Sequence, residues 1–306
     1  MALPSSCLKL RAPAKVNLAL AVLGHLPDGY HRVETVLQTV SLWDEVTLTA
    51  RPRGITIACR EPGVPTDETN LCYQAAALLS EFLPPAPRRG VAIGLRKHIP
   101  MQAGLGGGSS DAAATLVGLK RLWGLRLHRA QLQELAARLS ADGPFFVEGG
   151  CALATGRGDS VERVGAGPRL HFVLVRQGPG VSTAWAYAKR LPRSPKGACQ
   201  AMARAAGGAS PTAIAGLLHN DLEAAVLPER PDIADLKAHL LSEGALGALM
   251  AGSGAAVFGI FPTHRAAQES AARMSKNGIW ARAVHSIGRG VVVEAADTPT
   301  GRGATL

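Results

Sequence analysis

The fold is decided by one stretch of the sequence, Pro100-Met101-Gln102-Ala103-Gly104-Leu105-Gly106-Gly107-Gly108-Ser109-Ser110-Asp111. Four of its residues are glycine, which can adopt positive φ and lets a bulky anion come close to the main chain. An apolar-periodic segment follows, and it predicts a helix. The first turn of such a helix points unpaired N–H groups and a positive dipole end at the preceding loop. The stretch therefore predicts a loop that holds phosphate.

The helix after this loop has a clear apolar stripe, made of Ala112, Leu116, Leu119 and Trp123. These positions lie on one face of a helix of 3.6 residues per turn. We expect Ser109 or Ser110 to cap it and Asp111 to lie in its first turn, since hydroxyl and carboxylate groups stabilise helix N-termini.

Other classes of phosphate loop lack required residues here. A P-loop needs a lysine before its Ser or Thr, and this loop has none. A dinucleotide fingerprint needs a third glycine where Ser109 stands, and 120–129 offers no acidic residue for a ribose. The H-R-D and D-F-G motifs of protein kinases are absent. A plain tight turn before a helix stays an alternative, but a tight turn does not require so many glycines.

The composition bounds the partners. The formal net charge of +10 suits nucleic acid, an anionic membrane surface or phosphorylated small molecules. The basic residues form no run of five or six and no aromatics are interleaved with them, so a nucleic-acid partner is not expected. There is no signal-peptide h-region and no apolar run of membrane-spanning length. Five widely spaced cysteines show no zinc spacing, so we expect reduced thiols and a cytoplasmic protein without membrane contact.

Strand and helix patterns intermix along the chain without strict βαβ alternation, which indicates an α+β fold. We predict a domain boundary where the composition turns loop-like, giving domains 1–165 and 166–306, and a disordered tail from about Thr298. The expected strands are 15–22, 45–50, 55–59, 91–96, 145–147, 152–154 and 171–175. The expected helices are 70–82, 128–139, 217–226 and 233–241, with a loop-rich segment over 192–211 and a glycine turn at 250–254 before an apolar run.

Two candidate chemical groups stand out from these elements. Lys15 and Asn17 alternate with apolar residues and so share the open face of a half-buried strand. Asp142 lies in a turn beyond a predicted helix, where a carboxylate can face a cleft. The residues alone leave both open, because an isolated strand lysine is usually solvated and a turn aspartate often bonds its own backbone.

The glycine loop resembles the ATP loop of the GHMP kinase superfamily, the galactose, homoserine, mevalonate and phosphomevalonate kinases. Further stretches carry the resemblance in the order and spacing of the family, from about residue 10 to 290. They are Pro13-Ala14-Lys15-Val16-Asn17-Leu18, Asp28-Gly29-Tyr30-His31, Ala141-Asp142-Gly143-Pro144, His219-Asn220-Asp221-Leu222-Glu223 and Met250-Ala251-Gly252-Ser253-Gly254.

The resemblance implies a two-domain GHMP kinase-like fold, with a ribosomal-protein-S5-like N-terminal domain and an α/β-sandwich C-terminal domain. It implies ATP as phosphoryl donor, with Mg²⁺ expected alongside it, bound by the loop 100–110. It further implies a small-molecule acceptor, the 2-hydroxyl of the methylerythritol unit of a cytidine diphospho-substrate, on the methylerythritol phosphate route to isoprenoids. The metal ligands and the oligomeric state are not implied. Another member of the superfamily, or a nucleic-acid- or dinucleotide-binding module, stays an alternative.

The resemblance also assigns roles to residues. Asp142 would be the general base, Lys15 its charged partner and Asn17 a group that orients the hydroxyl. Ser109 or Ser110 would offer a hydroxyl to phosphate or Mg²⁺.

Tyr30 would stack on the cytosine and His31 would bond its edge, with Trp185 or Tyr187 as the opposing aromatic. A glycine turn at 252–254 either approaches the site or only enters a strand, and 219–223 is expected to be structural.

The motif around Asp142 departs from the family pattern at two positions. Ser140 replaces a usual glycine and Gly143 replaces a usual branched residue. We therefore expect the backbone that carries Asp142 to differ from the family or to be looser.

Overall fold

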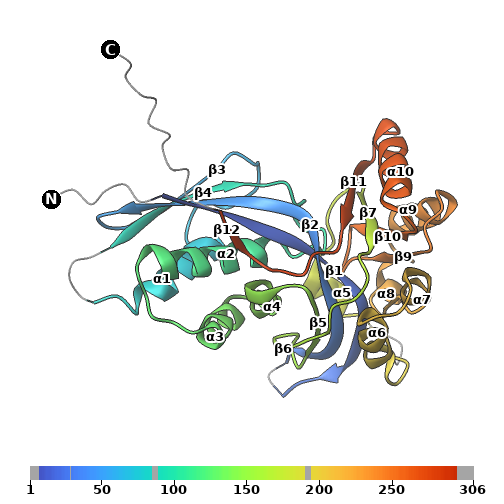
Figure 1. The fold of residues 1–306 in the computed structure, drawn as a ribbon, viewed down its shortest axis with the longest axis horizontal. Coiled ribbons are helices and arrows are strands. Elements are labelled where there is room, and N and C mark those ends of the chain that lie inside the picture. Colours follow the sequence, from blue (N-terminus) through green and yellow to red (C-terminus); the bar gives the residue numbers. More distant parts are fainter. Residues whose placement is uncertain (1–6, 28, 85–88, 190–193, 295–306) are drawn as a thin grey trace, which may run out of the picture.

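Two β-sheets, each with its own helices, make up the structure (Figure 1). It is a computed structural model that describes residues 7–294 except 28, 85–88 and 190–193. The first sheet has the order β12-β1-β2-β4-β3, with β5 and β8 paired to β2 and β1, and β6 paired to β5. Its strands are β1 (Cys7–His25), β2 (His31–Arg51), β3 (Ile55–Cys59), β4 (Gly90–Arg96), β5 (Cys151–Thr155), β6 (Ser160–Arg163), β8 (His219–Asn220) and β12 (Val292–Val293).

The long hairpin of β1 and β2 runs through the middle of the molecule (Figure 1). A turn closed by a bond from the Gly29 N–H to the Leu26 carbonyl joins the strands, as Pro27-Asp28-Gly29 predicts; Asp28 itself lies outside the described residues. The expectation of an open face on β1 is wrong. Residues 14–21 are all buried, because the helices of the first half cover one face and the second sheet covers the other.

Four helices lie along one face of the first sheet (Figure 1). The predictions over 70–82 and 128–139 are confirmed, with Asn70 as N-cap of the first of these helices. The strand expected over 145–147 is wrong, because a short apolar run fits a buried helix as well as a buried strand. The helices are α1 (Leu71–Ser80), α2 (Gly107–Leu122), α3 (Arg129–Leu139) and α4 (Gly143–Glu148).

The helix after the glycine loop begins earlier than expected. Gly106 is the N-cap of α2 with φ of 73°, so the helix starts at Gly107. The expectation that Ser109 or Ser110 caps the helix is wrong, since both lie inside it, and Asp111 lies beyond its first turn. A left-handed residue at the cap is accessible to glycine with little strain, and this moves the start of the helix into the glycine run.

The second sheet is antiparallel, with the order β11-β7-β10-β9. The strand predicted over 171–175 and the helix over 233–241 are confirmed, whereas 192–211, expected to be loop-rich, contains a helix. The second half has β7 (His171–Arg176), β9 (Gly247–Met250), β10 (Val257–Phe261), β11 (Trp280–His285), α5 (Thr183–Tyr187), α6 (Ala198–Ala206), α7 (Pro211–Ala215), α8 (Glu223–Val226), α9 (Pro231–Ser242) and α10 (His264–Lys276).

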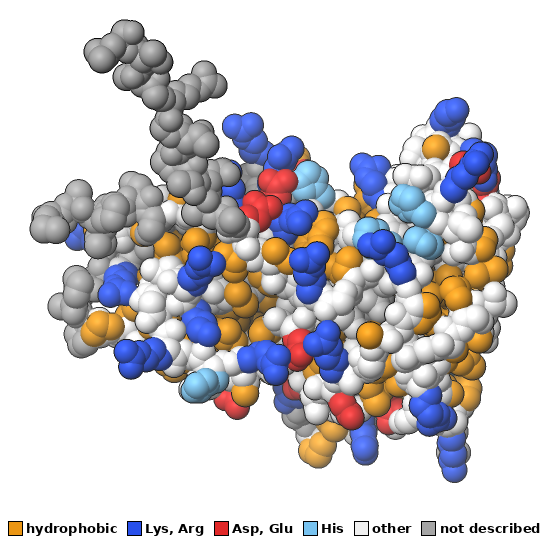
Figure 2. Space-filling model, in the orientation of Figure 1, with side chains coloured by type: hydrophobic (Ala, Val, Ile, Leu, Met, Phe, Trp, Pro, Cys, Tyr) orange, Lys and Arg blue, Asp and Glu red, His pale blue; other side chains and the backbone are white. Residues whose placement is uncertain are grey.

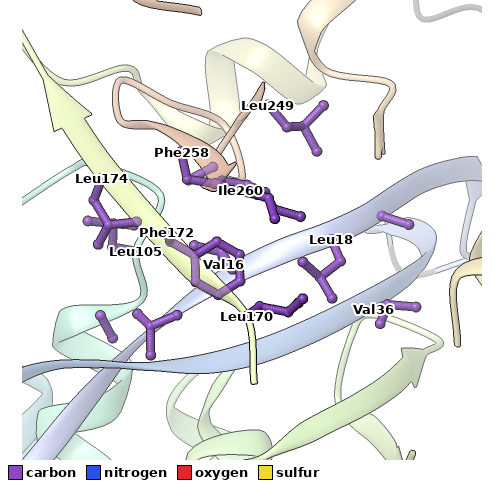
Figure 3. Packing of buried hydrophobic residues seen from close by; sticks show 14 of the residues in the cluster. Val16, Leu18, Val36, Leu105, Leu170, Phe172, Leu174, Leu249, Phe258 and Ile260 are labelled. Atoms are coloured by element: carbon purple, nitrogen blue, oxygen red, sulfur yellow. The ribbon is translucent and has the colours of Figure 1, made fainter. Parts of the chain in front are cut away.

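The two halves share one apolar core. In Figure 3, Val16 and Leu18 of β1 face Phe172 of β7 and Ile260 of β10. Leu105, from the middle of the glycine loop, is 1% exposed and belongs to the same cluster. The loop is therefore anchored in the core that joins the two sheets.

The predicted boundary falls between two neighbouring strands of different sheets. β6 of the first sheet ends at Arg163, and β7 of the second sheet begins at His171. The second half nevertheless returns to the first sheet through β8 and β12, which both pair with β1. The boundary at 165/166 stays a prediction, and the tail from Thr298 lies outside the described residues.

Candidate active site

Lys15 is buried and held by a short chain of hydrogen bonds. Its Nζ donates to Asn17 Oδ1 at 2.7 Å, and Asn17 Nδ2 donates to Thr35 Oγ1 at 2.8 Å. Thr35 in turn donates to the Ala19 carbonyl at 2.7 Å. The shared face of Lys15 and Asn17 is thus confirmed, whereas Thr35 on the neighbouring strand was not found from the sequence.

Asp142 lies beside this ammonium. Its Oδ2 is 3.4 Å from Lys15 Nζ, and its side chain is 30% exposed, against 5% for that of Lys15. The carboxylate is therefore the member of the pair that a ligand can reach. The structure brings together the two residues that the sequence proposed as catalytic partners.

The backbone around Asp142 is tightly packed rather than loose. Gly143 is buried, and a Cβ there would lie 2.5 Å from the Ala136 carbonyl oxygen of α3. The Gly143 N–H also donates to the Ser140 carbonyl at 3.1 Å. The glycine that replaces a branched residue allows α3 and α4 to approach closely, so the expectation of a looser backbone is wrong.

The glycine loop lies directly against Lys15. The Lys15 N–H donates to the Leu105 carbonyl at 3.0 Å. A Cβ at Gly106 would lie 3.1 Å from Lys15 Cγ and 2.7 Å from Phe146 Cζ of α4. The loop, the ammonium and the helix that follows Asp142 thus form one continuous surface.

The turn at 250–254, in the second half of the chain, packs directly against the glycine loop. A Cβ at Gly104 would lie 1.8 Å from the Ala251 carbonyl oxygen, and one at Gly252 would lie 3.2 Å from the Gly104 carbonyl oxygen. Asn220 Nδ2 fixes this glycine turn by donating to the Met250 and Gly252 carbonyls at 2.9 and 2.8 Å. The turn at 250–254 therefore does approach the site, and Asn220 serves to hold it.

A buried ion cluster underlies the start of α2. Lys97 Nζ pairs with Asp44 Oδ2 and, at 2.5 Å, with Asp111 Oδ2. Burial raises the pKa of Asp111 and the nearby Asp44 charge adds to this, against the opposing effect of Lys97. A Cβ at Gly107 would lie 3.2 Å from Lys97 Nζ. Nothing in the spacing of these three residues along the sequence indicates the cluster.

The two loop serines differ in access. Ser110 is fully buried and its Oγ has no hydrogen-bond partner among the described residues, whereas Ser109 is half-buried. Of the residues that open α2, Gly107, Gly108 and Ser109 are therefore accessible to a ligand, whereas Ser110 is not. Ser109 is the serine that fits the expected role toward phosphate.

Aromatic residues gather beside Asp142. The His31 ring lies 5.0 Å from that of Tyr187 and 4.3 Å from that of His25. Burial, and then the charges of Asp142 and Asp221, raise the pKa of Tyr187. Burial, and then the charge of His25, lower the pKa of His31. Of the two aromatics considered in the second half, Tyr187 is the one that contacts His31.

Tyr30 is separate from this pair and points outward. It is 59% exposed, and the Arg157 guanidinium lies 4.3 Å from the centre of its ring. Arg157 was not found from the sequence, because its approach depends on a hairpin more than 120 positions along the chain.

A cavity of about 1030 Å³ adjoins the beginning of the glycine loop. Pro100, Met101 and Gln102 line one side of it, and Glu61 and Gly63 lie near them. The remaining wall comes from both sheets and includes Arg11, Trp43, Arg176, Trp280 and Arg282. The cavity is large enough for a nucleoside beside a loop that can hold its phosphates.

Two absences bear on function within the described part of the chain. No three His, Cys, Asp or Glu side chains there are grouped as a metal site. No helix of residues 7–294, outside the gaps given above, is long and apolar enough to span a membrane.

Fold and site define a GHMP kinase. The profile of the GHMP kinases N terminal domain matches residues 70–150, and that of the GHMP kinases C terminal domain matches residues 202–279. The crystal structure of a homoserine kinase from Cytophaga hutchinsonii has the same fold, with a TM-score of 0.75 at 21% identity over 96% of this chain and 100% of that one. The chain is accordingly an ATP-dependent kinase.

Relatives of higher sequence identity show which family of GHMP kinases the chain belongs to. A 4-diphosphocytidyl-2-C-methyl-D-erythritol kinase of Synechococcus sp. (strain JA-2-3B'a(2-13)) is 49% identical over 83% of this chain and 85% of the relative. The kinase of that name from Bacillus velezensis is 44% identical over 82% and 86%. A crystal structure of 4-(cytidine 5'-diphospho)-2C-methyl-D-erythritol kinase superposes with a TM-score of 0.76 at 31% identity, over 92% of this chain and 99% of that one. The chain belongs to the 4-diphosphocytidyl-2-C-methyl-D-erythritol kinase family.

Proposed function

We propose that the chain transfers the γ-phosphoryl group of ATP to the 2-hydroxyl of 4-diphosphocytidyl-2-C-methyl-D-erythritol, giving the 2-phosphate and ADP in isoprenoid biosynthesis. One observation carries the proposal. The Lys15–Asp142 pair lies against residues 105–106 of the glycine loop, so a carboxylate that can accept a hydroxyl proton adjoins a loop that can hold phosphate. Membership of the family supplies the substrate class.

The donor binds along the glycine loop. Residues 100–110 surround the triphosphate, with the accessible backbone of Gly108 and the hydroxyl of Ser109 at the start of α2. The nucleoside then occupies the cavity that begins at Pro100, Met101 and Gln102. This arrangement directs the γ-phosphate toward Lys15, since Leu105 and Gly106 lie directly against that residue.

The transfer step needs little beyond positioning and charge stabilisation. The acceptor oxygen attacks the γ-phosphorus, its proton passes to Asp142, and the bond from the γ-phosphorus to the bridging oxygen of ADP breaks. Lys15 stands 3.4 Å from Asp142 Oδ2, where its positive charge stabilises the negative charge that develops on the oxygens. Because Lys15 is buried and bonded to Asn17, its position is fixed before the substrates bind.

Magnesium is expected with ATP, and the residues present fit it. Mg²⁺ usually keeps several waters and is held by one or two carboxylates plus substrate phosphates. Asp142, beside Lys15, and Ser109, at the start of α2, are two oxygen donors that a ligand can reach. When bound, the ion would shield charge on the phosphates.

The acceptor end is formed by the aromatic residues. We assign the cytosine to Tyr30, His31 and Tyr187, with His31 and Tyr187 already in contact. Asn17 uses Oδ1 for Lys15 and one N–H of Nδ2 for Thr35. An amide nitrogen carries two hydrogens, so Nδ2 can make a second hydrogen bond. Asn17 holds Lys15, and its assignment to the acceptor hydroxyl stays a prediction.

The test is product formation from ATP with the cytidine substrate, homoserine and mevalonate, each supplied separately. We expect phosphorylation of the cytidine substrate only, and turnover of another alcohol instead would refute the assignment. Asp142→Asn should lower kcat by about 10²–10⁴-fold, because the general base is removed. The affinity for ATP should be unchanged, because the glycine loop is not altered. Asp235→Asn on the exposed side of α9 is the matched control and should be unchanged.

The cytoplasmic location and the lack of a nucleic-acid partner stay predictions. Figure 2 shows Lys and Arg side chains spread over one face among hydrophobic and uncharged ones, rather than gathered in one large patch. Filter binding with duplex DNA over a salt series tests the second prediction, because binding driven by phosphate contacts falls steeply with salt.

A further inference from the structure

We propose that three histidines and an arginine at one end of the second sheet bind a doubly charged oxyanion, a phosphate group that is either free or part of an ester. These residues are Arg169, His171, His264 and His285. None of them belongs to the glycine loop, to the Lys15–Asp142 pair or to the lining of the cavity beside the loop. The site is therefore separate from the proposed active site and does not depend on the proposed function.

The sheet places two of the histidines directly opposite each other. His171 begins β7 and His285 ends β11, and the two are register partners in this antiparallel pair. The side chains of such partners lie on the same face of a sheet. On its other side His171 is paired with Phe261, the last residue of β10, and α10 begins shortly afterwards at His264. The His264 ring lies 5.6 Å from that of His171, so three imidazoles meet at this end of the sheet.

One nitrogen of each sheet histidine is left for a ligand. His285 Nδ1 lies 3.1 Å from Ser41 Oγ of β2, and the same oxygen accepts a bond from the His285 N–H at 3.0 Å. His171 Nδ1 is buried and has no hydrogen-bond partner among the described residues. Both rings are half-buried, and in both of them Nε2 is therefore the nitrogen that a ligand can contact.

Arg169 adds a permanent positive charge to the three rings. The residue after it is fixed to the end of β11, because the Leu170 N–H donates to Ser286 Oγ and the Ser286 N–H donates to the Leu170 carbonyl, both at 2.9 Å. Arg169 is exposed, and its guanidinium has no ion pair or hydrogen bond with any residue that the structure describes. Its five N–H donors are thus available to a ligand.

The charged groups that act on the two sheet histidines are all positive. Burial, and then the three other members of the cluster, lower the pKa of His285. Burial, and then His264 and Arg169, lower the pKa of His171. In Figure 2, His side chains gather with a Lys or Arg one over the place that β7, β11 and α10 occupy in Figure 1, and no Asp or Glu lies between them. Like charges that face one another without a counter-ion repel, so the cluster lacks a negative partner.

An oxyanion supplies this negative partner. Imidazolium and guanidinium groups both donate charge-assisted hydrogen bonds to phosphate oxygens, and the planar guanidinium can contact two oxygens at once. Binding then favours the protonated rings, so the anion raises their pKa and the chain takes up protons when it binds. A metal ion does not fit as well, because Arg169 would repel it and no three His, Cys, Asp or Glu of the described residues are grouped as a metal site.

The experiment follows the titration of each histidine by NMR, in sulfate and in chloride of equal ionic strength. Sulfate is the probe because it keeps both charges throughout the titration, whereas a phosphate group itself gains a proton near pH 6. We expect sulfate to raise the pKa of the three cluster histidines by about 1, which corresponds to about tenfold tighter binding to the protonated form. His239, which faces Glu243 on α9, is the internal control and should titrate identically in both salts.

Two variants at exposed residues test the cluster without disturbing the core. Arg169→Met and His264→Gln should each weaken sulfate binding, measured from the shifts of the remaining cluster resonances, by about tenfold. Arg204→Met, the same change at an exposed arginine of α6, is the matched control and should bind sulfate normally. All three variants should keep the kcat of the unmodified chain, because these residues lie outside the proposed active site.

Replacing sulfate by inorganic phosphate and by glycerol 3-phosphate identifies the source of the anion. Tighter binding of the ester assigns the site to a phosphorylated metabolite, and tighter binding of inorganic phosphate assigns it to the free ion. Histidine pKa values that are the same in sulfate and in chloride overturn the inference. An equal rise for His239 also overturns it, because the effect would then belong to the salt and not to a site. Unchanged sulfate binding by both Arg169→Met and His264→Gln has the same consequence.

Discussion

Replacing Gly104 by alanine tests whether the second half of the chain sets the shape of the glycine loop. Gly104 has φ of 73°, and its position meets the backbone of the turn at 250–254. A Cβ there would lie 1.8 Å from the Ala251 carbonyl oxygen, 2.7 Å from its carbonyl carbon and 3.3 Å from the Gly252 nitrogen. Real Cβ atoms essentially never approach other heavy atoms within 3.0 Å, so the loop and the turn must separate.

The size of the effect follows from these contacts. A left-handed alanine costs about 1 kcal/mol relative to glycine. Forcing the two backbones apart adds about 1–3 kcal/mol, as for other overpacked sites. We therefore expect Gly104→Ala to lower the free energy of unfolding by about 2–4 kcal/mol. A displacement of about 1 Å at the loop would also lower kcat by about 10²-fold.

Urea denaturation and steady-state kinetics with varied ATP measure the two effects. Gly108→Ala is the matched control in the same loop, because its Cβ would meet only Leu71 Cδ1, at 3.9 Å, and the residue lies inside α2. Its stability should stay the same or rise by about 0.5–1 kcal/mol, whereas its KM for ATP should rise, since this backbone is accessible to phosphate. If Gly104→Ala unfolds at the same urea concentration as the unmodified chain and keeps its kcat, the turn at 250–254 does not hold the glycine loop, and our reasoning is refuted.

Three further changes test the supports of the site. Thr35→Val should lower the free energy of unfolding by about 1–3 kcal/mol, because Asn17 Nδ2 and the Ala19 carbonyl lose their hydrogen-bond partner. It should also lower kcat more than it changes KM for ATP. Urea denaturation and steady-state kinetics measure the two effects. Gly143→Val should lower the free energy of unfolding by about 1–3 kcal/mol in the same urea assay, since a Cβ there would lie 2.5 Å from the Ala136 carbonyl oxygen. Asp111 has a raised pKa in the folded state, so the folded chain holds a proton that the unfolded chain releases above about pH 4. Stability should therefore fall as the pH rises from about 4 to neutral, by up to about 1.4 kcal/mol per pH unit, and Asp111→Asn should remove this slope in urea titrations at several pH values.

The sequence predicts the parts of the fold that depend on local pattern. The helices over 70–82 and 128–139 follow from apolar periodicity, and α1 also has the N-cap Asn70. The start of α2 does not follow, because capping rules favour Ser109 or Ser110 whereas a left-handed Gly106 begins the helix earlier. The prediction of a strand over 145–147 is wrong for another reason, since a run of three apolar residues is too short to show a period that separates a helix from a strand.

The site residues likewise include some that the sequence predicts and some that it does not. Lys15, Asn17 and Asp142 could be named because they fall in motifs with a family pattern, and the structure brings them together. Thr35 could not, because its contact with Asn17 depends on how β1 and β2 pair. The open face expected for Lys15 is in fact covered, because the pattern of one strand cannot show that a second sheet packs against it.

The motif around Asp142 shows how a departure from a family pattern should be interpreted. A glycine in place of a branched residue suggests flexibility when only the backbone freedom of glycine is considered. In the fold, Gly143 is the point where α4 meets the Ala136 carbonyl of α3, at a distance that admits no side chain. In this chain the backbone of Gly143 is therefore in direct contact with α3, and this contact restrains the residue that follows Asp142. A substitution at a catalytic motif therefore changes which atoms hold the catalytic residue, and whether they hold it more loosely depends on the neighbouring helix.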